Sequence, residues 1–239
     1  MSIKRNAEAS RFVVKLDNVW KEYRSKEISY TAIKGISLTI SRGEFLTILG
    51  ASGSGKTTLL DLIGTLDNPT KGKIFIDGVD TSLLSDKELS LLRNEKIGFV
   101  FQAYNLVPYL TALENAILPL VVCGRDNEQG IEFAKKLLSE VGLREKINKK
   151  PNEVSGGEQQ RIAIVRALIN KPQLVLADEP TGNLDSKNSE AVLHLLAKMS
   201  KEENVTVVMA THDPDLTKLS DRSIYIKDGL IEKETRVRQ

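Results

Sequence analysis

The sequence predicts an α/β fold with a mainly parallel central sheet, an antiparallel patch near the N-terminus and an inserted group of helices. Short apolar segments typical of buried strands alternate with segments of helical periodicity along most of the chain. The first two strand-like segments, 12–23 and 30–40, have turn-like rather than helical links, which favours antiparallel pairing. The stretch between Gln102 and Ser155 has helical periodicity and predicts the insertion.

The expected elements follow in a regular order. The expected strands are 12–23, 30–40, 44–50, 72–78, 96–101, 174–177, 206–210 and a pair within 222–232. Outside the insertion, the expected helices are 56–66, a helix that begins at Ser155 and one from Ser186 to about Lys201. Residues 1–10 are expected to be frayed.

Composition favours one domain over residues 1–239, with a helical subdomain inserted at about 103–165. The chain is 41% hydrophobic, and no linker rich in Pro, Gly or Ser divides it. Its formal net charge of +2 is too balanced to indicate nucleic-acid binding by itself, and no nucleic-acid partner is expected. Cys123 is the only cysteine, so an internal disulfide is excluded and a reducing compartment fits.

No segment predicts secretion or membrane insertion. The longest apolar run, 116–123, is far shorter than the ~20 residues that a spanning helix needs. The first ten residues lead into no apolar region of a secretory signal. Any role at a membrane is therefore expected to depend on partners.

Residues 50–58, GASGSGKTT, match the phosphate-binding pattern G-x-x-x-x-G-K-[ST] between a strand and a helix. Backbone N–H groups and the helix N-terminus can wrap a polyphosphate closely where glycines remove the side chains. Lys56 is expected to reach the β- and γ-phosphates, and Thr57 to bind Mg²⁺. A plain Gly/Ser turn would not need every fixed position. The sequence thus predicts a nucleoside triphosphate site made of Gly50, Ala51, Ser52, Gly53, Ser54, Gly55, Lys56, Thr57 and Thr58.

An apolar strand ends in Asp178 and Glu179, at the sheet edge where ligands bind in such folds. Asp178 is expected to hold Mg²⁺, and Glu179 to deprotonate the water that attacks the γ-phosphate. Taken alone, Asp-Glu before Pro is more often the start of a loop. Beside a phosphate loop the pair predicts hydrolysis of the triphosphate.

Two other polar side chains follow expected strands. Gln102 could bind Mg²⁺ or position the water, and His212 could bond the γ-phosphate. Each assignment depends on the neighbouring motifs, because a single polar residue after a strand is usually only surface. His194 lies on an amphipathic helix and is expected to be a packing or surface residue.

The segment VSGGEQQR, residues 154–161, predicts a helix that begins at an anion site. Ser155 and Glu158 have the spacing of a capping box, yet Gly156 and Gly157 fill the first turn at a cost of about 1 kcal/mol each. Glycines at a helix N-terminus allow an anion to approach closely. Since residues 50–58 already form one cradle, the two sites serve either two ligands or one ligand shared between two chains.

These motifs together resemble the ABC ATPases across essentially the whole chain. VSGGEQQR is similar to the LSGGQ signature, residues 50–57 to Walker A, LVLADE to Walker B, and GNLD (182–185) to the D-loop. The resemblance implies a P-loop NTPase with a RecA-like core, in which Gln102 is the Q-loop residue and His212 the switch histidine. It also implies that Tyr23 stacks on adenine and that Asp185 belongs to the nucleotide site.

In this family two ATPase domains pack head to tail. The resemblance therefore implies that Ser155, Gly156 and Gly157 of one chain close on the γ-phosphate held by the other, with ATP and Mg²⁺ bound and a homodimer formed. Val154 replaces the usual Leu, and Glu158 the commoner Gln. We expect both departures to be tolerated, because a capping-box Glu158 points its charge at its own helix.

Finer matches, at 64–78 and 96–120, resemble the ATPase subunits of lipoprotein-releasing and macrolide-exporting transporters. They imply transmembrane permease subunits as partners, a place on the cytoplasmic face of the membrane, and export of a lipophilic, peptide or lipoprotein substrate. Tyr104 to Leu120 is the expected docking segment, although its apolar residues could simply be core.

Three other classes of protein remain to be weighed. An ATP-switched regulator of a membrane complex would use the same ATPase, so the sequence does not distinguish it from a transporter subunit. A soluble ABC ATPase of DNA repair would carry long coiled coils, and one of translation usually two ATPase units. A small-molecule kinase would leave the signature glycines, Asp185 and His212 unexplained.

Overall fold

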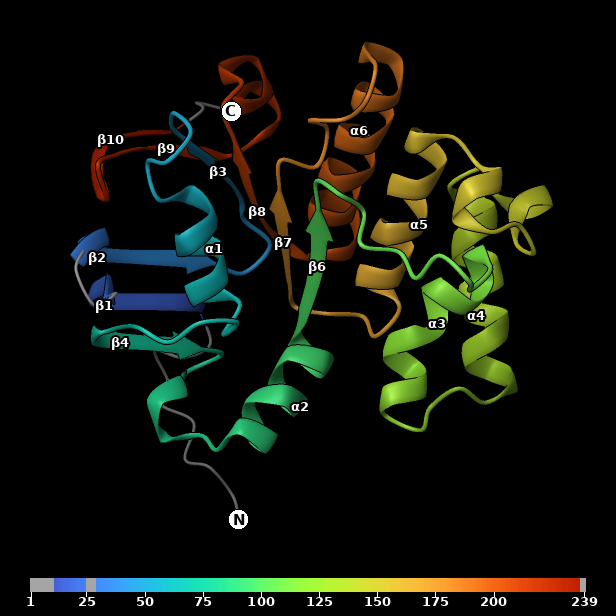
Figure 1. Ribbon diagram of the computed structural model, residues 1–239, viewed down its shortest axis with the longest axis horizontal. Helices are drawn as coiled ribbons and strands as arrows, with labels where there is room; N and C mark the ends of the chain where they lie inside the picture. Colours follow the sequence, from blue (N-terminus) through green and yellow to red (C-terminus); the bar gives the residue numbers. More distant parts are fainter. Residues whose placement is uncertain (1–10, 25–28, 237–239) are drawn as a thin grey trace.

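The computed structural model describes residues 11–24 and 29–236. Residues 1–10, which the sequence predicts to be frayed, lie outside the described residues. Two sheets lie side by side with helices around them, and a group of helices stands apart from the antiparallel sheet, beyond the parallel one (Figure 1). The expected α/β architecture, with a mainly parallel core, an antiparallel N-terminal part and inserted helices, is confirmed.

The smaller sheet is antiparallel and contains the first strands of the chain. Its order is β2 (Ser29–Ser41), β1 (Phe12–Arg24), β4 (Lys71–Ile76) and β5 (Val79–Asp80). Val14 pairs with Ile40 on one side and Ile76 on the other, and all three are buried. This sheet brings the end of β1 and the start of β2 beside the larger sheet's ligand edge.

The larger sheet has six strands and is parallel except at one edge. Its order is β10 (Leu230–Arg236), β9 (Arg222–Lys227), β3 (Phe45–Leu49), β8 (Thr206–Thr211), β7 (Leu174–Asp178) and β6 (Ile97–Phe101). Only β10 is antiparallel to its neighbour. The carboxyl ends of β3, β6, β7 and β8 therefore reach one edge, which is where such sheets bind ligands.

Helices cover both faces of this sheet and form the insertion. They are α1 (Lys56–Ile63), α2 (Asp86–Lys96), α3 (Ala112–Val122), α4 (Glu128–Glu140), α5 (Gly156–Leu168) and α6 (Ser186–Glu203), with short 3₁₀ turns at 81–83, 144–146, 151–153 and 214–219. The sequence did not predict α2, although Ser85 and Glu88 form its capping box. The first predicted helix is shorter than 56–66, because it ends at Ile63 and Thr65 turns the chain with φ of 54°.

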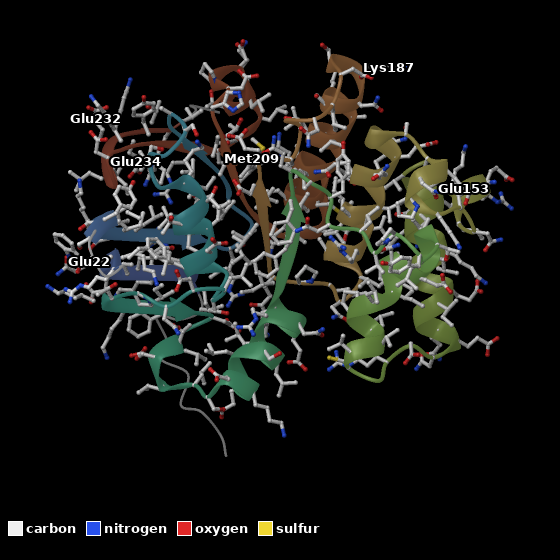
Figure 2. The ribbon with its side chains drawn as sticks, in the orientation of Figure 1. Glu22, Glu153, Lys187, Met209, Glu232 and Glu234 are labelled. Carbon is white, nitrogen blue, oxygen red and sulfur yellow. The ribbon has the colours of Figure 1, made fainter. Side chains whose placement is uncertain are left out.

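Three apolar clusters form the core. One fills the space between the antiparallel sheet, α1 and the larger sheet, and a second lies between the larger sheet, α5 and α6. Figure 2 shows Met209 of the second cluster in the middle of the molecule, whereas Glu22, Glu153, Glu232 and Glu234 lie at its outside. The third cluster holds α3, α4 and α5 together. Within the described residues, no helix has the length and apolar character to cross a membrane.

Candidate nucleotide-binding site

The loop between β3 and α1 has the backbone of a phosphate cradle. Gly53 and Gly55 adopt φ of 77° and 107°, in a region that residues with side chains rarely occupy. Gly55 is also the N-cap of α1, so the loop runs directly into a helix N-terminus. Backbone N–H groups in such alternating conformations form a concave anion site.

Neighbouring backbone holds this loop on three sides. A Cβ on Gly50 would stand 2.4 Å from the carbonyl oxygen of Ile226, and one on Gly55 would stand 2.7 Å from that of Ala32. The Gly229 N–H donates to the Ser54 carbonyl oxygen over 3.0 Å. Two of the glycines are therefore needed for close packing as well as for ligand access.

Lys56 is buried, and its ammonium group bonds to the loop itself. Its Nζ donates to the carbonyl oxygens of Gly50 and Ala51 over 2.9 and 3.1 Å, and it stands 3.8 Å from a carboxylate oxygen of Glu179. The charge is thus held inside the cradle, next to the carboxylate that the sequence assigned to hydrolysis.

Glu179 lies between charged and polar partners just beyond β7. His212 Nδ1 is 3.0 Å from both carboxylate oxygens, and the Thr211 hydroxyl donates to Oε2 over 3.4 Å. The Glu179 backbone has φ of 45°, an unfavourable conformation for a residue with a side chain. Its N–H donates to the Ala210 carbonyl oxygen, which fixes the turn after β7 against the end of β8.

Asp178 meets the first turn of α1. Its Oδ2 accepts a hydrogen bond from the Thr57 hydroxyl over 2.9 Å, whereas Oδ1 is buried and has no partner among the residues that the structure describes. Burial raises the pKa of Asp178; the adjacent Glu179 carboxylate also raises it, against the Thr57 hydrogen bond and the Lys56 charge. A buried carboxylate oxygen without a partner is costly and indicates a place for a cation.

The oxygen atoms of Thr57 and Asp178 suit Mg²⁺ bound together with a nucleotide. Magnesium takes oxygen ligands, commonly one or two carboxylates, substrate phosphates and several waters. Among the described residues, no group of three or more His, Cys, Asp or Glu side chains could hold a metal ion. An ion at this position would therefore draw on the hydroxyl, the unpartnered oxygen and the phosphates.

Gln102 follows β6 and contacts the loop after Glu179. A Cβ on Gly182 would stand 2.7 Å from its Nε2, and Asn183 Nδ2 donates to the Gln102 carbonyl oxygen over 3.0 Å. The side chain is exposed at the ligand edge of the sheet. The structure thus places Gln102 beside the Glu179 turn, and within the described part of the chain no hydrogen bond joins it to Asp178 or Thr57.

Tyr23 lies beside the end of the phosphate loop. Its hydroxyl donates to Asp67 Oδ2 over 2.9 Å, and the Lys21 ammonium group stands 4.9 Å from the centre of its ring. Burial raises the pKa of Tyr23; the bond to Asp67 also raises it, and a hydrogen bond with Thr58 opposes both. The residue is 43% exposed, so part of this aromatic side chain remains accessible next to the cradle.

The capping box predicted for α5 is present. The Ser155 N–H donates to Glu158 Oε2 over 2.7 Å, and the Glu158 N–H donates to Ser155 Oγ over 3.3 Å. Lys146 Nζ lies 3.9 Å from the other carboxylate oxygen of Glu158. The Glu158 carboxylate thus has its partners within its own chain, as the sequence predicts for a capping residue.

The two signature glycines have a reason within the chain that the sequence did not reveal. A Cβ on Gly157 would stand 2.3 Å from Asn188 Oδ1 of α6, and one on Gly156 would stand 2.8 Å from the Tyr104 hydroxyl. Asn188 donates from its backbone N–H and its side-chain amide to Asp185, the N-cap of α6, each over 2.9 Å. Its Oδ1 accepts from Arg161 over 3.3 Å. The glycines therefore let α5 approach the α6 N-terminus and the D-loop.

Three further residues at the site were missed by sequence reasoning. The Gln160 side chain is fully buried and donates to the Pro180 carbonyl oxygen over 2.7 Å, which supports the turn after Glu179. Asn188 has the D-x-x-N spacing of a helix cap, a signal that could have found it. Tyr30 donates to the Gly53 carbonyl oxygen over 3.1 Å, and no local pattern of the sequence points to this contact.

The predicted residues fall into two groups in space. The phosphate loop, Asp178, Glu179 and His212 are joined by direct contacts at one edge of the larger sheet. Figure 1 shows α1 on the side of the antiparallel sheet and α5 beyond the strands β7 and β6, toward the inserted helices. Within the described chain, the tip of α5 therefore does not complete the chain's own phosphate site.

The comparisons with known proteins agree with this geometry. The family described as ABC transporter matches residues 33–182. The lipoprotein-releasing system ATP-binding protein LolD of Aquifex aeolicus is 50% identical over 226 residues, which cover 94% of this chain and 99% of LolD. The macrolide export ATP-binding/permease protein MacB of Syntrophobacter fumaroxidans is 46% identical over 225 residues, 93% of this chain and 32% of MacB.

A solved structure of the ATP-binding cassette MJ0796 of Methanocaldococcus jannaschii, described as dimeric and post-hydrolysis with ADP and Pi, is similar throughout. Its TM-score is 0.88 at 46% identity, and the match covers 95% of this chain and 99% of that one. The family match spans more than half of the chain, and the alignments with LolD and MacB cover 94% and 93% of it. The chain therefore belongs to the ABC transporter family, as an ATP-binding subunit with the fold and the site of an ATP hydrolase.

Proposed function

We propose that this chain hydrolyses ATP at the interface of a head-to-tail pair and so drives a membrane permease. The observation that carries the proposal is the cluster at the sheet edge, where Glu179 contacts His212 and Lys56, and Asp178 keeps a buried oxygen without a partner. A chain built only to bind a nucleotide would not need a strained carboxylate beside the cradle.

Each residue of the cluster has a definite role. The loop and Lys56 bind the phosphates, and Tyr23 offers its exposed ring to the adenine. Thr57, Asp178 and Gln102 would hold Mg²⁺, which would neutralise phosphate charge during transfer. Glu179 accepts a proton from the attacking water. His212 orients Glu179 and bonds to the γ-phosphate.

The site is finished by a second copy of the chain. The α5 tip is separated from the phosphate loop of its own chain, and its Ser155 is exposed. The MJ0796 structure, at 46% identity, is described as dimeric. We infer that Ser155, Gly156 and Gly157 approach the γ-phosphate held by the partner, with Asp185 at the same interface.

The membrane partner is proposed from the relatives and the exposed insertion. MacB is named as an ATP-binding and permease protein in one, and LolD as part of a lipoprotein-releasing system. Tyr109 of the 104–120 segment is 77% exposed, and Val121 and Val122 beside it are also exposed. We propose that this helical part, about 103–165, docks on a permease that exports or releases a lipophilic, peptide or lipoprotein substrate, which places the chain at the cytoplasmic face.

The dimer is tested with the Glu179→Gln variant, which keeps ATP binding and removes the base. Size-exclusion chromatography should show a dimer with ATP and magnesium and a monomer without them, because ATP bridges both chains. ADP lacks the γ-phosphate and should not support the dimer. A monomer under all three conditions would refute the shared site.

A further inference from the structure

Tyr30 is an exposed residue of β2 whose hydroxyl reaches the phosphate loop. Its Oη donates to the Gly53 carbonyl oxygen over 3.1 Å, while 52% of the residue remains exposed. Gly53 has φ of 77°, and no atom lies within 4 Å of the place where its Cβ would stand. The tip of the loop is therefore poorly packed, and the bond from Tyr30 ties it to β2.

Three attachments at the base of the loop join it to the backbone of neighbouring segments. Gly50 packs on the Ile226 carbonyl oxygen, Gly55 on that of Ala32, and Ser54 accepts from the Gly229 N–H. The fold itself fixes these contacts at the base of the loop. The contact at Gly53 differs because it comes from a side chain, so a single substitution can remove it without moving a strand.

Tyr30 stands directly opposite Tyr23 in the register of β1 and β2. Directly opposed residues project from the same face of an antiparallel pair. The two hydroxyls nevertheless have different acceptors, because Tyr23 donates to Asp67 Oδ2 after α1 and Tyr30 donates to the loop tip. Tyr23 thus lies where the base of the nucleotide is expected, whereas Tyr30 holds the loop that is expected to bind the phosphates.

We propose that Tyr30 is a positioning residue that holds the tip of the phosphate loop in its binding conformation. A glycine-rich loop loses much conformational freedom when it orders around a ligand, and a tether that orders it beforehand strengthens binding. The tether acts on the phosphates, so its effect does not depend on the base. This inference rests on the proposed binding of ATP.

The test compares a nucleotide with a phosphate chain that has no base. Affinities of the full-length protein for ATP and for inorganic tripolyphosphate, both with magnesium, are measured by displacement of a fluorescent ATP analogue. Tyr30→Phe should weaken both ligands by the same factor, about 3- to 10-fold, as expected for one hydrogen bond. The KM for ATP should rise by that factor while kcat stays the same.

Two further variants separate the tether from base stacking and from general damage. Tyr23→Leu removes the ring beside the base and should weaken ATP alone. Tyr225→Phe removes a hydroxyl that makes no hydrogen bond among the described residues, and neither affinity should change. Unchanged melting temperatures would show that all three variants fold.

The inference is overturned if Tyr30→Phe weakens ATP and leaves tripolyphosphate unchanged, because Tyr30 would then contact the nucleoside. It is also overturned if both affinities stay the same or become tighter. If the wild-type protein binds neither ligand, the proposed function fails instead, and the two failures are thus distinguishable.

Discussion

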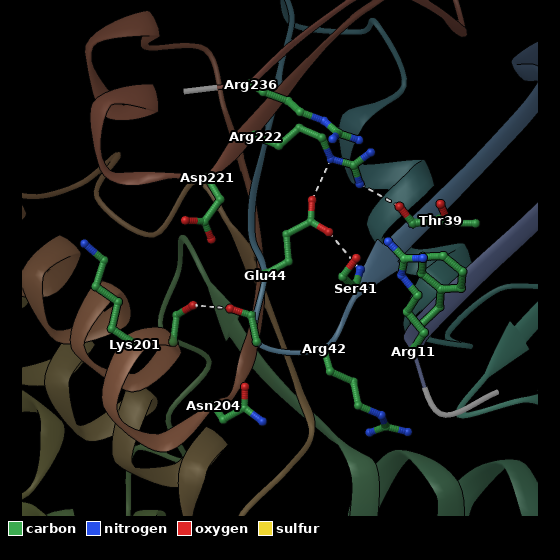
Figure 3. Close-up of a pocket in the computed structure, with 13 residues that line it drawn as sticks. Arg11, Thr39, Ser41, Arg42, Glu44, Lys201, Asn204, Asp221, Arg222 and Arg236 are labelled. Atoms are coloured by element: carbon green, nitrogen blue, oxygen red, sulfur yellow. Dashed lines mark hydrogen bonds and ion pairs between the residues drawn. The ribbon is translucent and has the colours of Figure 1, made fainter. Parts of the chain in front are cut away.

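The two ends of the six-stranded sheet both gather charged side chains, but they treat the charges differently. At the amino-terminal end, a cavity of about 860 Å³ is lined by residues that include Arg11, Arg42, Lys201, Arg222 and Arg236. Figure 3 shows Glu44 between Arg222 and Ser41 in this cavity. At the carboxyl-terminal end lie the phosphate loop, Asp178 and Glu179.

The buried charges of the amino-terminal cavity satisfy one another. Arg222 donates to Glu44 over 2.5 Å, to Glu234 over 3.2 Å and to the Thr39 carbonyl oxygen over 2.6 Å. Glu44 also accepts from the Ser41 N–H, and Asp221 accepts from the Phe45 N–H. This network ties β2, β3, β9 and β10 together, and each nitrogen of the buried guanidinium donates one hydrogen bond.

The carboxyl-terminal end leaves its polar groups incompletely bonded. Asp178 Oδ1 and Ser54 Oγ are buried and have no partner in the described part of the chain. The Lys56 ammonium group donates to two neutral carbonyl oxygens. Unmet polar groups cost stability unless a ligand bonds to them. The comparison teaches that charge alone does not mark a site; buried charge that the chain itself leaves unpaired does.

The largest expected effect is at the unpaired end. Glu179→Gln should lower ATP turnover on the order of 10²–10⁴-fold, because the amide cannot accept the proton of the attacking water. The melting temperature should change little, since the amide oxygen of the variant can still accept from Thr211 and from His212. The matched control is Glu190→Gln on α6, whose exposed carboxylate lies 3.6 Å from His194 and has no other ion pair within the described ranges 11–24 and 29–236. Normal turnover in Glu179→Gln would remove Glu179 from the mechanism.

The opposite pattern is expected at the paired end. Arg222→Met leaves Glu44 buried without its partner and should lower the free energy of unfolding by about 3–5 kcal/mol. Chemical denaturation measures this loss, and Arg236→Met, on a 78% exposed side chain, is the control with little change. Adding Glu44→Gln to Arg222→Met should restore part of the stability. A stable but inactive Arg222→Met protein would contradict the structural role.

Gly157→Ala should lower the stability by an intermediate amount, at a glycine of the signature segment that packs against α6. The added methyl group would stand 2.3 Å from Asn188 Oδ1, so α5 and the α6 N-terminus must move apart. Crowding of this kind costs about 1–3 kcal/mol. Asn188→Ala in the same chain should recover the stability by making room, and thermal unfolding of the single and double variants measures the difference. Equal losses in both would show that the contact is not the cause.

The local patterns of the sequence predicted one part of the site well. The loop at 50–58, the strand that ends in Asp178, and the Ser155–Glu158 capping box each lie within a few consecutive residues, where spacing alone sets the geometry. The helix α2 was missed although Ser85 and Glu88 carry the same capping pattern, because no apolar stripe of the expected period accompanied it.

The contacts that the sequence did not predict join segments far apart in the chain. Tyr30 meets Gly53 across 23 positions, Gln160 meets Pro180 across 20, and Gln102 meets Asn183 across 81. Spacing carries no information about such pairs, because the packing of whole elements creates them. The reason for Gly157 was likewise hidden, since Asn188 reaches it only when α6 packs on α5.

The smallest expected effect has the opposite sign. Asp178→Asn removes a charge whose Oδ1 is buried without a partner, while an amide oxygen can still accept from Thr57. Near neutral pH the nucleotide-free variant should melt a few degrees higher than the wild type, about 2–4 °C for each kcal/mol gained. Burial raises the pKa of Asp178 above its ordinary 3.8, so ionisation is what costs stability.

The stability gain of Asp178→Asn should therefore shrink as the pH falls through the raised pKa of the folded carboxyl toward the ordinary value of 3.8, because the wild-type carboxylate takes up its proton in that range. Scanning fluorimetry from neutral to acid pH measures this trend, and the same scan with magnesium and ATP should reverse the order of the two proteins. The reversal is the sharpest form of the comparison, because it shows the same oxygen weakening the empty protein and strengthening the loaded one. If the variant melted lower than the wild type without ligand, the Asp178 charge would stabilise the empty protein, as the paired charges at the amino-terminal end of the sheet do.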